Sequence, residues 1–403
     1  MSASPRSEID SPTAWARLSV CLVLGTIGSI GMWSFAVVLP AVQRDFGIVR
    51  ADASLPYTLS MIGFAFGSVA MGRLSDRLGP AAPASGGALL LAMGYVGAGY
   101  APNIWLLALA YGTLGFGSAA TFGPLMADIS HWFARRRGIA VALASCGNYL
   151  AGTLWPPLIQ HYIAASGWRP THIGIGALCL VSMLPLALML RRPPPKHDIV
   201  PAQTAARGSL GVSSNVLMGL LCIAGVGCCV AMAMPQVHIV AYCGDLGYGI
   251  ARGAQILSVM LGFGLISRVA CGFIADRIGG VATLLLSSFL QGVSLLFYLF
   301  FDSLASLFVI SALFGLFQGG LVPMYTLVVR QYFAPQEVGA RVGIVLMATV
   351  FGMALGGWMS GAIFDWTGAY WMAFLNGLIW NLLNFTIVLW LFLRPGRRLA
   401  LAG

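Results

Sequence analysis

Arg268 is the residue of this chain whose surroundings point most directly to chemistry. It lies in an apolar stretch, 257–279, that is long enough to cross a membrane as a helix. An arginine near the centre of such a helix costs roughly 2.5–3.5 kcal/mol on insertion scales. Two interpretations are open: Arg268 faces a polar cavity and binds an anion, or it is a structural residue that pairs with helix ends and water.

The depth and the shape of the Arg268 side chain favour the anion site. Asp276 follows eight residues later, so Arg268 lies about 12 Å along the helix from the next loop. That depth is greater than a snorkelling side chain comfortably spans. A guanidinium fork matches a carboxylate, and no acidic residue occupies the middle of a span as its permanent partner. One buried positive charge balances one carboxylate, which favours a monoanion over a dianion.

The elements that must position this arginine are membrane helices. Hydrophobic residues make up 59% of the 403 residues and charged residues only 8%, whereas soluble domains carry about 25% charge. Apolar runs of about 20 residues predict helices, since a barrel would show shorter alternating segments. The net charge of +10 comes from basic residues in loops, so membrane orientation explains it and no nucleic-acid partner is expected. The eight cysteines lack metal-ligand spacing and are interpreted as small core residues.

The sequence predicts an all-α membrane protein with twelve transmembrane helices. An even number of spans puts both termini on one side, and assigning that side to the cytoplasm places most arginines there, including those at 135–137 and 191–192. The polar N-terminus has no signal-peptide pattern, and we expect a multi-pass protein of the inner (cytoplasmic) membrane. The expected spans lie at about 15–40, 55–75, 82–101, 104–128, 139–165, 172–191, 214–242, 252–275, 281–301, 304–329, 339–365 and 370–393.

A proline-containing segment divides the chain into two similar halves. Residues 192–213 are predicted to be a cytoplasmic linker between an N-terminal six-helix bundle, 1–191, and a C-terminal one, 214–403. Internal similarity supports this division, because 72–79 recurs at 272–279, 132–133 at 332–333 and 44–47 at 244–247. Parallel repeats of this kind are common in transporters that work by alternating access.

The first repeated motif, Gly-x-x-x-Asp-Arg-x-Gly, has residue types suited to a conformational latch on the cytoplasmic side. Its glycines allow a tight turn, its aspartate can accept hydrogen bonds from a helix N-terminus, and its arginine can pair with a carboxylate across the bundle. A plain helix–turn–helix loop with a solvated charge pair is the alternative. The candidate latch residues are Gly72, Asp76, Arg77 and Gly79, with their counterparts Gly272, Asp276, Arg277 and Gly279.

With its paired loop motif, twelve spans and long central linker, the whole chain resembles the major facilitator superfamily. The segments HWFARRRGIA (131–140), GWR (167–169) and PQVHIVAYCGDLG (235–247) are similar to the monocarboxylate transporter branch and its bacterial relatives, including the oxalate–formate exchangers. The resemblance implies two pseudo-symmetric six-helix bundles. It also implies a substrate-binding role for Arg268, which stands where that branch places its arginine in span 8.

The chain departs from this branch at two informative positions. Gly264 stands where the eukaryotic members typically have an aspartate one turn before the arginine, which puts aspartate-mediated proton transfer in doubt. Residues 343–361 contain no lysine or arginine, whereas the oxalate exchangers pair the arginine with a lysine in span 11. The second departure leaves Arg268 as a single buried cation, which favours a monocarboxylate over a dianion.

Several further residues are candidates for the site. His238 and Asp128 are candidates for proton coupling, although a hydrogen-bonded structural histidine and a helix-end aspartate are the commoner cases. Polar and aromatic side chains within spans tend to turn inward, where they bind substrate or hold helices together. The candidates for substrate binding beside Arg268 are Asn148, Tyr149, Tyr111, Tyr57 and Gln318.

The sequence therefore predicts a secondary transporter that moves a small monocarboxylate such as lactate, pyruvate or formate, with a proton as the expected partner. An organic-anion exchanger of the oxalate–formate type, or a proton-coupled exporter of another small organic compound, is the alternative. No phosphate-binding loop, GxSxG or HExxH motif occurs, so neither ATP-driven transport nor an enzyme is expected. We expect no cofactor and no metal, and a protein that functions as a monomer in the lipid bilayer.

Overall fold

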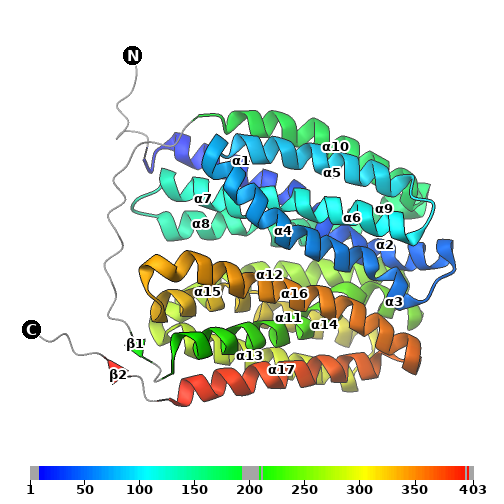
Figure 1. The fold of residues 1–403 in the computed structure, drawn as a ribbon. Helices are drawn as coiled ribbons and strands as arrows, with labels where there is room; N and C mark the ends of the chain where they lie inside the picture. Colours follow the sequence, from blue (N-terminus) through cyan, green and yellow to red (C-terminus); the bar gives the residue numbers. More distant parts are fainter. Residues whose placement is uncertain (1–8, 193–207, 210–211, 395–396, 399–403) are drawn as a thin grey trace, which may run out of the picture. The chain divides into compact units, whose positions relative to one another are not determined.

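The computed structural model describes residues 9–192, 208–209, 212–394 and 397–398, and nearly all of them are helical (Figure 1). Two short strands, β1 (Gly208–Ser209) and β2 (Arg397–Arg398), form an antiparallel pair. The expectation of an all-α membrane protein is confirmed. Most of the expected linker, at 193–207 and 210–211, lies outside the described residues.

The helical segments fit the expected twelve spans. In the described part of the chain, 11 helical stretches are long and apolar enough to cross a membrane. The expected span that is not among these 11 is the fifth, which is formed by α8 (Arg137–Ser145) and α9 (Gly147–Ser166). It contains Asn148, Gln160 and two internal prolines, Pro156 and Pro157, which make it less apolar than the others.

The chain forms two compact units. Unit 1 comprises Met1–Asp198 together with Val237–Gly262. Two of its helices begin at a polar cap that the sequence supplies: Ser11 Oγ accepts from Ala14 N at 3.3 Å, and Asn103 Oδ1 accepts from Leu106 N at 3.0 Å. Besides α8 and α9, its helices from the first six spans are α1 (Pro12–Gly28), α2 (Ile30–Phe46), α3 (Arg50–Ala53), α4 (Leu55–Leu78), α5 (Ala81–Gly99), α6 (Ile104–Ser118), the 3₁₀ turn η2 (Ala119–Thr121), α7 (Gly123–Trp132) and α10 (Trp168–Met189).

Unit 2 comprises Ile199–Gln236 and Phe263–Gly403. It therefore holds the first part of α11 (Ser214–Asp245) and the last part of α12 (Ile250–Ile278). Its other helices are α13 (Gly280–Phe300), α14 (Leu304–Gln318), α15 (Leu321–Tyr332), α16 (Pro335–Thr367) and α17 (Tyr370–Leu393).

The internal repeat extends to the backbone. Gly47 and Gly247 both have a positive φ, of 62° and 81°, and so do Gly79 and Gly279, at 78° and 87°. Glycine suits these turns because it has no Cβ to oppose the left-handed conformation. The turns that follow the first and second spans of each half therefore recur at the same sequence offset.

Small residues let the helices of unit 1 approach backbone to backbone. A Cβ at Gly115 of α6 would lie 1.8 Å from the carbonyl oxygen of Ser60 in α4. A Cβ at Gly63 of α4 would likewise lie 2.1 Å from the carbonyl oxygen of Gly112. Lipid is as apolar as a leucine side chain, so helices in a membrane associate through such close contacts rather than through hydrophobic burial.

Several spans are interrupted near their middles, and three interruptions of unit 1 lie close together. The α1–α2 break at Ser29 follows Gly28, whose Cβ would lie 2.3 Å from Thr121 Oγ1 in the α6–α7 break. Gly147 begins α9 after the α8–α9 break, and its Cβ would lie 3.0 Å from the carbonyl carbon of Gly25. Interrupted helices at membrane depth are tolerated where other helices bury them, and they are a common feature of transporter binding sites.

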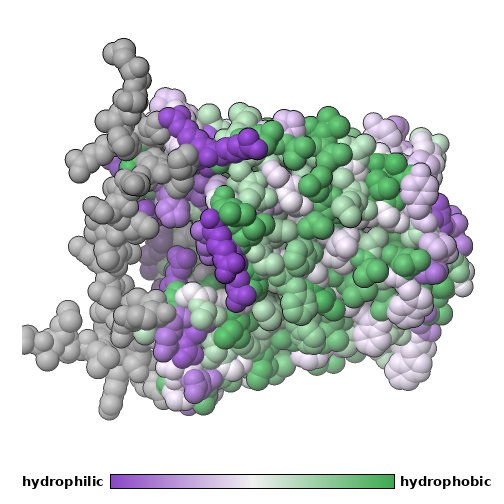
Figure 2. Space-filling view, turned by 45° about the horizontal axis from the view of Figure 1, so that its top comes forward, coloured by the Kyte–Doolittle hydropathy of each residue, from purple (hydrophilic) through white to green (hydrophobic). Residues whose placement is uncertain are grey.

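The surface supports a membrane setting. Large apolar side chains are exposed along the middle of the helices, including Phe66, Met93, Leu109 and Val181, which are 62–74% exposed. Figure 2 shows green, apolar side chains over the helix middles and purple, polar ones toward the helix ends. A soluble protein would bury such side chains, whereas lipid covers them without cost.

The close α4–α6 contact makes a stability prediction. Gly115→Ala should lower the free energy of unfolding by about 1–3 kcal/mol, because the new methyl group would force the backbones apart. The measurement is the thermal unfolding midpoint in detergent. Gly86→Ala in α5 is the matched control, since a Cβ there meets nothing within 4 Å. Equal midpoints for the two variants would contradict the packing described.

Candidate functional site

Arg268 lies in α12 beside the interruption between α14 and α15. A Cβ at Gly319 would lie 2.3 Å from the carbonyl oxygen of Gly264, so the break packs directly on the α12 backbone. Gly320 N donates to Ser267 Oγ at 3.1 Å, and Arg268 Nε donates to the Gly319 carbonyl oxygen at 3.5 Å. Arg268 is partly buried. Its guanidinium is thus held beside the α14–α15 break, where the regular helical hydrogen bonding is interrupted.

Gln318, a predicted site residue, is the last residue of α14 and immediately precedes this break. Its Oε1 accepts from Gln236 Nε2 of α11 at 3.2 Å, and both side chains are buried. Among the described residues, Gln318 Nε2 and Gln236 Oε1 have no hydrogen-bond partner. A buried amide without a partner is costly, so this pair has one donor and one acceptor available for water or a ligand.

Gln236 was missed as a site residue by sequence reasoning. It lies in the segment 235–247 that carries the family resemblance, directly after Pro235. A glutamine inside an apolar span is the signal that could have identified it, by the same logic that singled out Gln318. Within unit 2, the structure therefore brings Arg268, Gln318 and Gln236 to the same helix interruption.

Asn148 and Tyr149 lie at the start of α9, where the three breaks of unit 1 meet. Asn148 Oδ1 accepts from Trp33 Nε1 at 2.8 Å, and its Nδ2 contacts Met32 Sδ at 3.6 Å. Tyr149 is 6% exposed. Trp155, about two turns later in α9, donates from Nε1 to the Thr26 carbonyl oxygen at 2.9 Å. These contacts bind α9 to the interrupted first span.

Tyr111 belongs to a fully buried hydrogen-bond network. Its hydroxyl lies 2.8 Å from His172 Nε2, and His172 Nδ1 lies 2.7 Å from the carbonyl oxygen of Trp168. Tyr95 donates to Ser34 Oγ at 3.0 Å, and Ser34 lies 3.5 Å from the Tyr111 hydroxyl. Such a satisfied network joins α2, α5, α6 and α10 and gives them a fixed register.

The predicted site residues Tyr57 and His238 are also buried. Tyr57 in α4 is 4% exposed. His238 in α11 is fully buried, and it belongs to the segment 237–262 of unit 1. Tyr57 and His238 belong to unit 1, whereas Arg268 belongs to unit 2. Their roles in substrate binding and proton coupling stay predictions.

Asp128 forms a buried ion pair with Arg17. Arg17 Nε donates to Asp128 Oδ2 at 2.7 Å and Nη2 donates to Oδ1 at 3.0 Å, with side chains 6% and 2% exposed. Arg17 Nη2 also donates to the Leu190 carbonyl oxygen at 3.0 Å, and the guanidinium lies 4.6 Å from the Trp132 ring. The pair therefore links α1, α7 and the end of α10, which favours a structural role for Asp128.

The two predicted latch loops end α4 and α12 in the same way. Asp76, Arg77, Asp276 and Arg277 are exposed, and none of them forms an ion pair with another residue that the structure describes. Gly79 and Gly279 make the positive-φ turns, whereas Gly72 and Gly272 have open space around them. The last glycine of each motif forms the predicted tight turn. The role of the two loops as a conformational latch remains a prediction.

The Arg17–Asp128 pair makes the second prediction. Asp128→Ala should lower the free energy of unfolding by about 3–5 kcal/mol, because it leaves the Arg17 guanidinium buried without its carboxylate. The double variant Arg17→Met/Asp128→Leu should recover most of that loss. Thermal unfolding in detergent measures both. If Asp128→Ala unfolds at the wild-type temperature and only pH-driven uptake is lost, Asp128 carries the proton instead.

Comparison with known proteins places this geometry in context. The family profile described as Major Facilitator Superfamily matches residues 21–304 and 271–402. Monocarboxylate transporter 13 of Rattus norvegicus is 31% identical over 364 residues, which cover 88% of this chain and 82% of that protein. The Bos taurus protein of the same name is 32% identical over 362 residues, with the same coverage.

A solved structure supports the fold. The inward-facing, occupied structure of a bacterial homologue of the human lysosomal transporter Spinster has a TM-score of 0.73 to this chain at 14% identity. The match covers 95% of this chain and 97% of that one.

Proposed function

Because this chain belongs to the major facilitator superfamily and is homologous to monocarboxylate transporters, we propose that it carries a small monocarboxylate across the membrane by alternating access, together with a proton. The observation that carries the substrate class is Arg268, a partly buried guanidinium in the middle of a span and beside a helix interruption. Its fork can hold a carboxylate through two parallel hydrogen bonds.

The surroundings of Arg268 support a substrate with one carboxylate and a further polar group. The break that contains Gly319 lies next to the guanidinium. Gln318, which is hydrogen-bonded to Gln236 of α11, immediately precedes the break. An available amide N–H and an available amide oxygen could hydrogen-bond a keto or hydroxyl group beside the carboxylate. Lactate and pyruvate have this chemistry, and formate is their smallest analogue.

The setting of the transporter is part of the proposal. The chain is a multi-pass membrane protein of the major facilitator type. We place it in the cytoplasmic membrane with both termini in the cytoplasm, because the basic residues gather on that side of the predicted topology. The bundles at 1–191 and 214–403 are the moving halves of the proposed cycle, and a monomer suffices for it.

The substrate assignment is tested by a conservative substitution. Arg268→Lys keeps the charge but removes the planar fork, so uptake of labelled lactate into proteoliposomes should fall about tenfold or more. Arg252→Lys is the control on the same helix, since Arg252 is exposed and contacts Gln255 at 3.0 Å. Wild-type uptake by Arg268→Lys would remove Arg268 from the substrate site.

Proton coupling and substrate charge are tested together by a pH gradient. Proteoliposomes that are more acidic outside than inside should accumulate labelled lactate and formate, because proton entry drives entry of the monoanion. Oxalate should not accumulate, since Arg268 supplies a single positive charge. Dissipating the gradient with a proton ionophore is the control. Exchange of oxalate without accumulation of the monoanions would contradict both the coupling and the monoanion assignment.

A further inference from the structure

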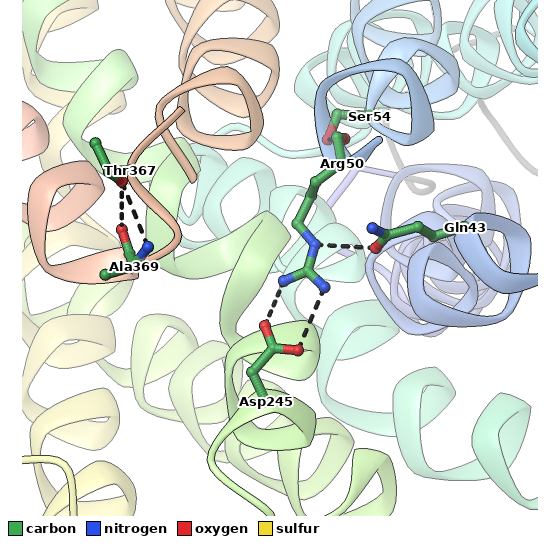
Figure 3. Close-up of polar contacts among 6 residues, drawn as sticks. All are labelled: Gln43, Arg50, Ser54, Asp245, Thr367 and Ala369. Carbon is green, nitrogen blue, oxygen red and sulfur yellow. Dashed lines mark hydrogen bonds and ion pairs between the residues drawn. The ribbon is translucent and has the colours of Figure 1, made fainter. Parts of the chain in front are cut away.

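A buried arginine joins the turn after α2 to the end of α11. Both terminal nitrogens of Arg50, the first residue of α3, donate to the Asp245 carboxylate, and Nη2 does so at 3.3 Å (Figure 3). Arg50 Nε donates to Gln43 Oε1 at 3.0 Å. The Arg50 side chain is only 7% exposed, whereas that of Asp245 is 39% exposed. Gln43, a residue of the first half, thus holds the Arg50 side chain, whereas the Asp245 carboxylate is accessible to water.

The internal repeat explains why Asp245 is available for this contact. Asp45 is its counterpart in the first half, and Asp45 Oδ2 accepts from Arg169 Nη2 at 2.9 Å. Arg169 lies at the turn between the fifth and sixth spans. The corresponding turn of the second half, at 367–370, has no basic residue, and Thr367 Oγ1 there donates to the Ala369 carbonyl oxygen at 3.0 Å (Figure 3). Asp245 therefore pairs with an arginine of the first half.

A second set of contacts holds the same segment. Ser258 Oγ of α12 donates to the Thr153 carbonyl oxygen, and a Cβ at Gly152 would lie 2.2 Å from Leu261 Cδ1. Residues 237–262, the end of α11 and the start of α12, accordingly belong to unit 1 with the first six spans. The segment begins two residues after Pro235, which interrupts the hydrogen bonding of α11.

We propose that Arg50 and Asp245 form a releasable gate at the non-cytoplasmic end of the transporter. The pair closes this end while 237–262 packs against the first six spans, and it separates when the segment moves away during alternating access. Separation is tolerable because water can hydrate Asp245, while Gln43 still accepts from Arg50. An ion pair between two fully buried partners would be far more costly to break.

The gate is tested by measuring the distance between two spin labels, one on each side of the pair. Val49→Cys and Ala251→Cys provide exposed positions, and Cys222→Ser removes the one native cysteine that is not buried. Arg50→Gln should raise the ratio of long to short distances at least about fivefold over wild type. The charge-reversed double variant Arg50→Asp/Asp245→Arg should bring the ratio back toward wild type.

Asp45→Asn is the matched control, because it removes the equivalent pair of the repeat, which involves only first-half residues. Its distances should match wild type. If Arg50→Gln does not fold, Asp245→Asn takes its place, since the aspartate is the more exposed partner. The proposal is overturned if neither neutral variant changes the ratio, or if Asp45→Asn changes it equally. The gate rests on the proposed alternating access and membrane orientation. No substrate is needed for this test, so a wrong carboxylate assignment leaves it unaffected.

Discussion

The contact between Gly264 and Gly319 is the constraint on which the candidate substrate site depends. A span interrupted inside a membrane exposes backbone groups that no water can satisfy. Here two glycines allow the α14–α15 break to lie directly on α12, where Ser267 accepts from the freed N–H of Gly320. The next residue of α12 is Arg268, so the close approach that makes the break possible also places the guanidinium beside it.

The asymmetry between the two halves accounts for much of the inferred function. The halves share turns, glycines and loop motifs at one offset, which gives them a common architecture. Arg268 has no counterpart in the first half, where Ser68 occupies the position. Arg169 has none at the corresponding turn of the second half, which leaves Asp245 to contact Arg50. The internal repeat provides the common helix arrangement, and the charged residues discussed here lie at positions where the two halves differ.

Buried polar residues fall into two groups in this structure. The Tyr111–His172 network and the Arg17–Asp128 pair have their main hydrogen bonds satisfied by protein groups, as expected of residues that hold helices together. The Gln236–Gln318 pair keeps an available donor and an available acceptor. The distinction matters because all of these residues look alike in the sequence, as single polar side chains in apolar spans.

The sequence by itself determined the membrane class, the helical spans, the internal repeat and the family resemblance. The comparisons confirm the family. These features are local or periodic: hydrophobic length defines a span, and a fixed offset defines a repeat. Arg268 could also be singled out, because a charge in a span is anomalous without any knowledge of its neighbours.

Only the tertiary structure decided the partners of these residues. Arg50 meets Asp245 across 195 residues, Arg17 meets Asp128 across 111, and Arg268 reaches the Gly319 carbonyl across 51. Hydropathy shows that a helix crosses the membrane but leaves its rotation and its neighbours open, because lipid accepts any apolar face. The close contacts of small residues fix both, and with them which polar side chains are satisfied and which remain available.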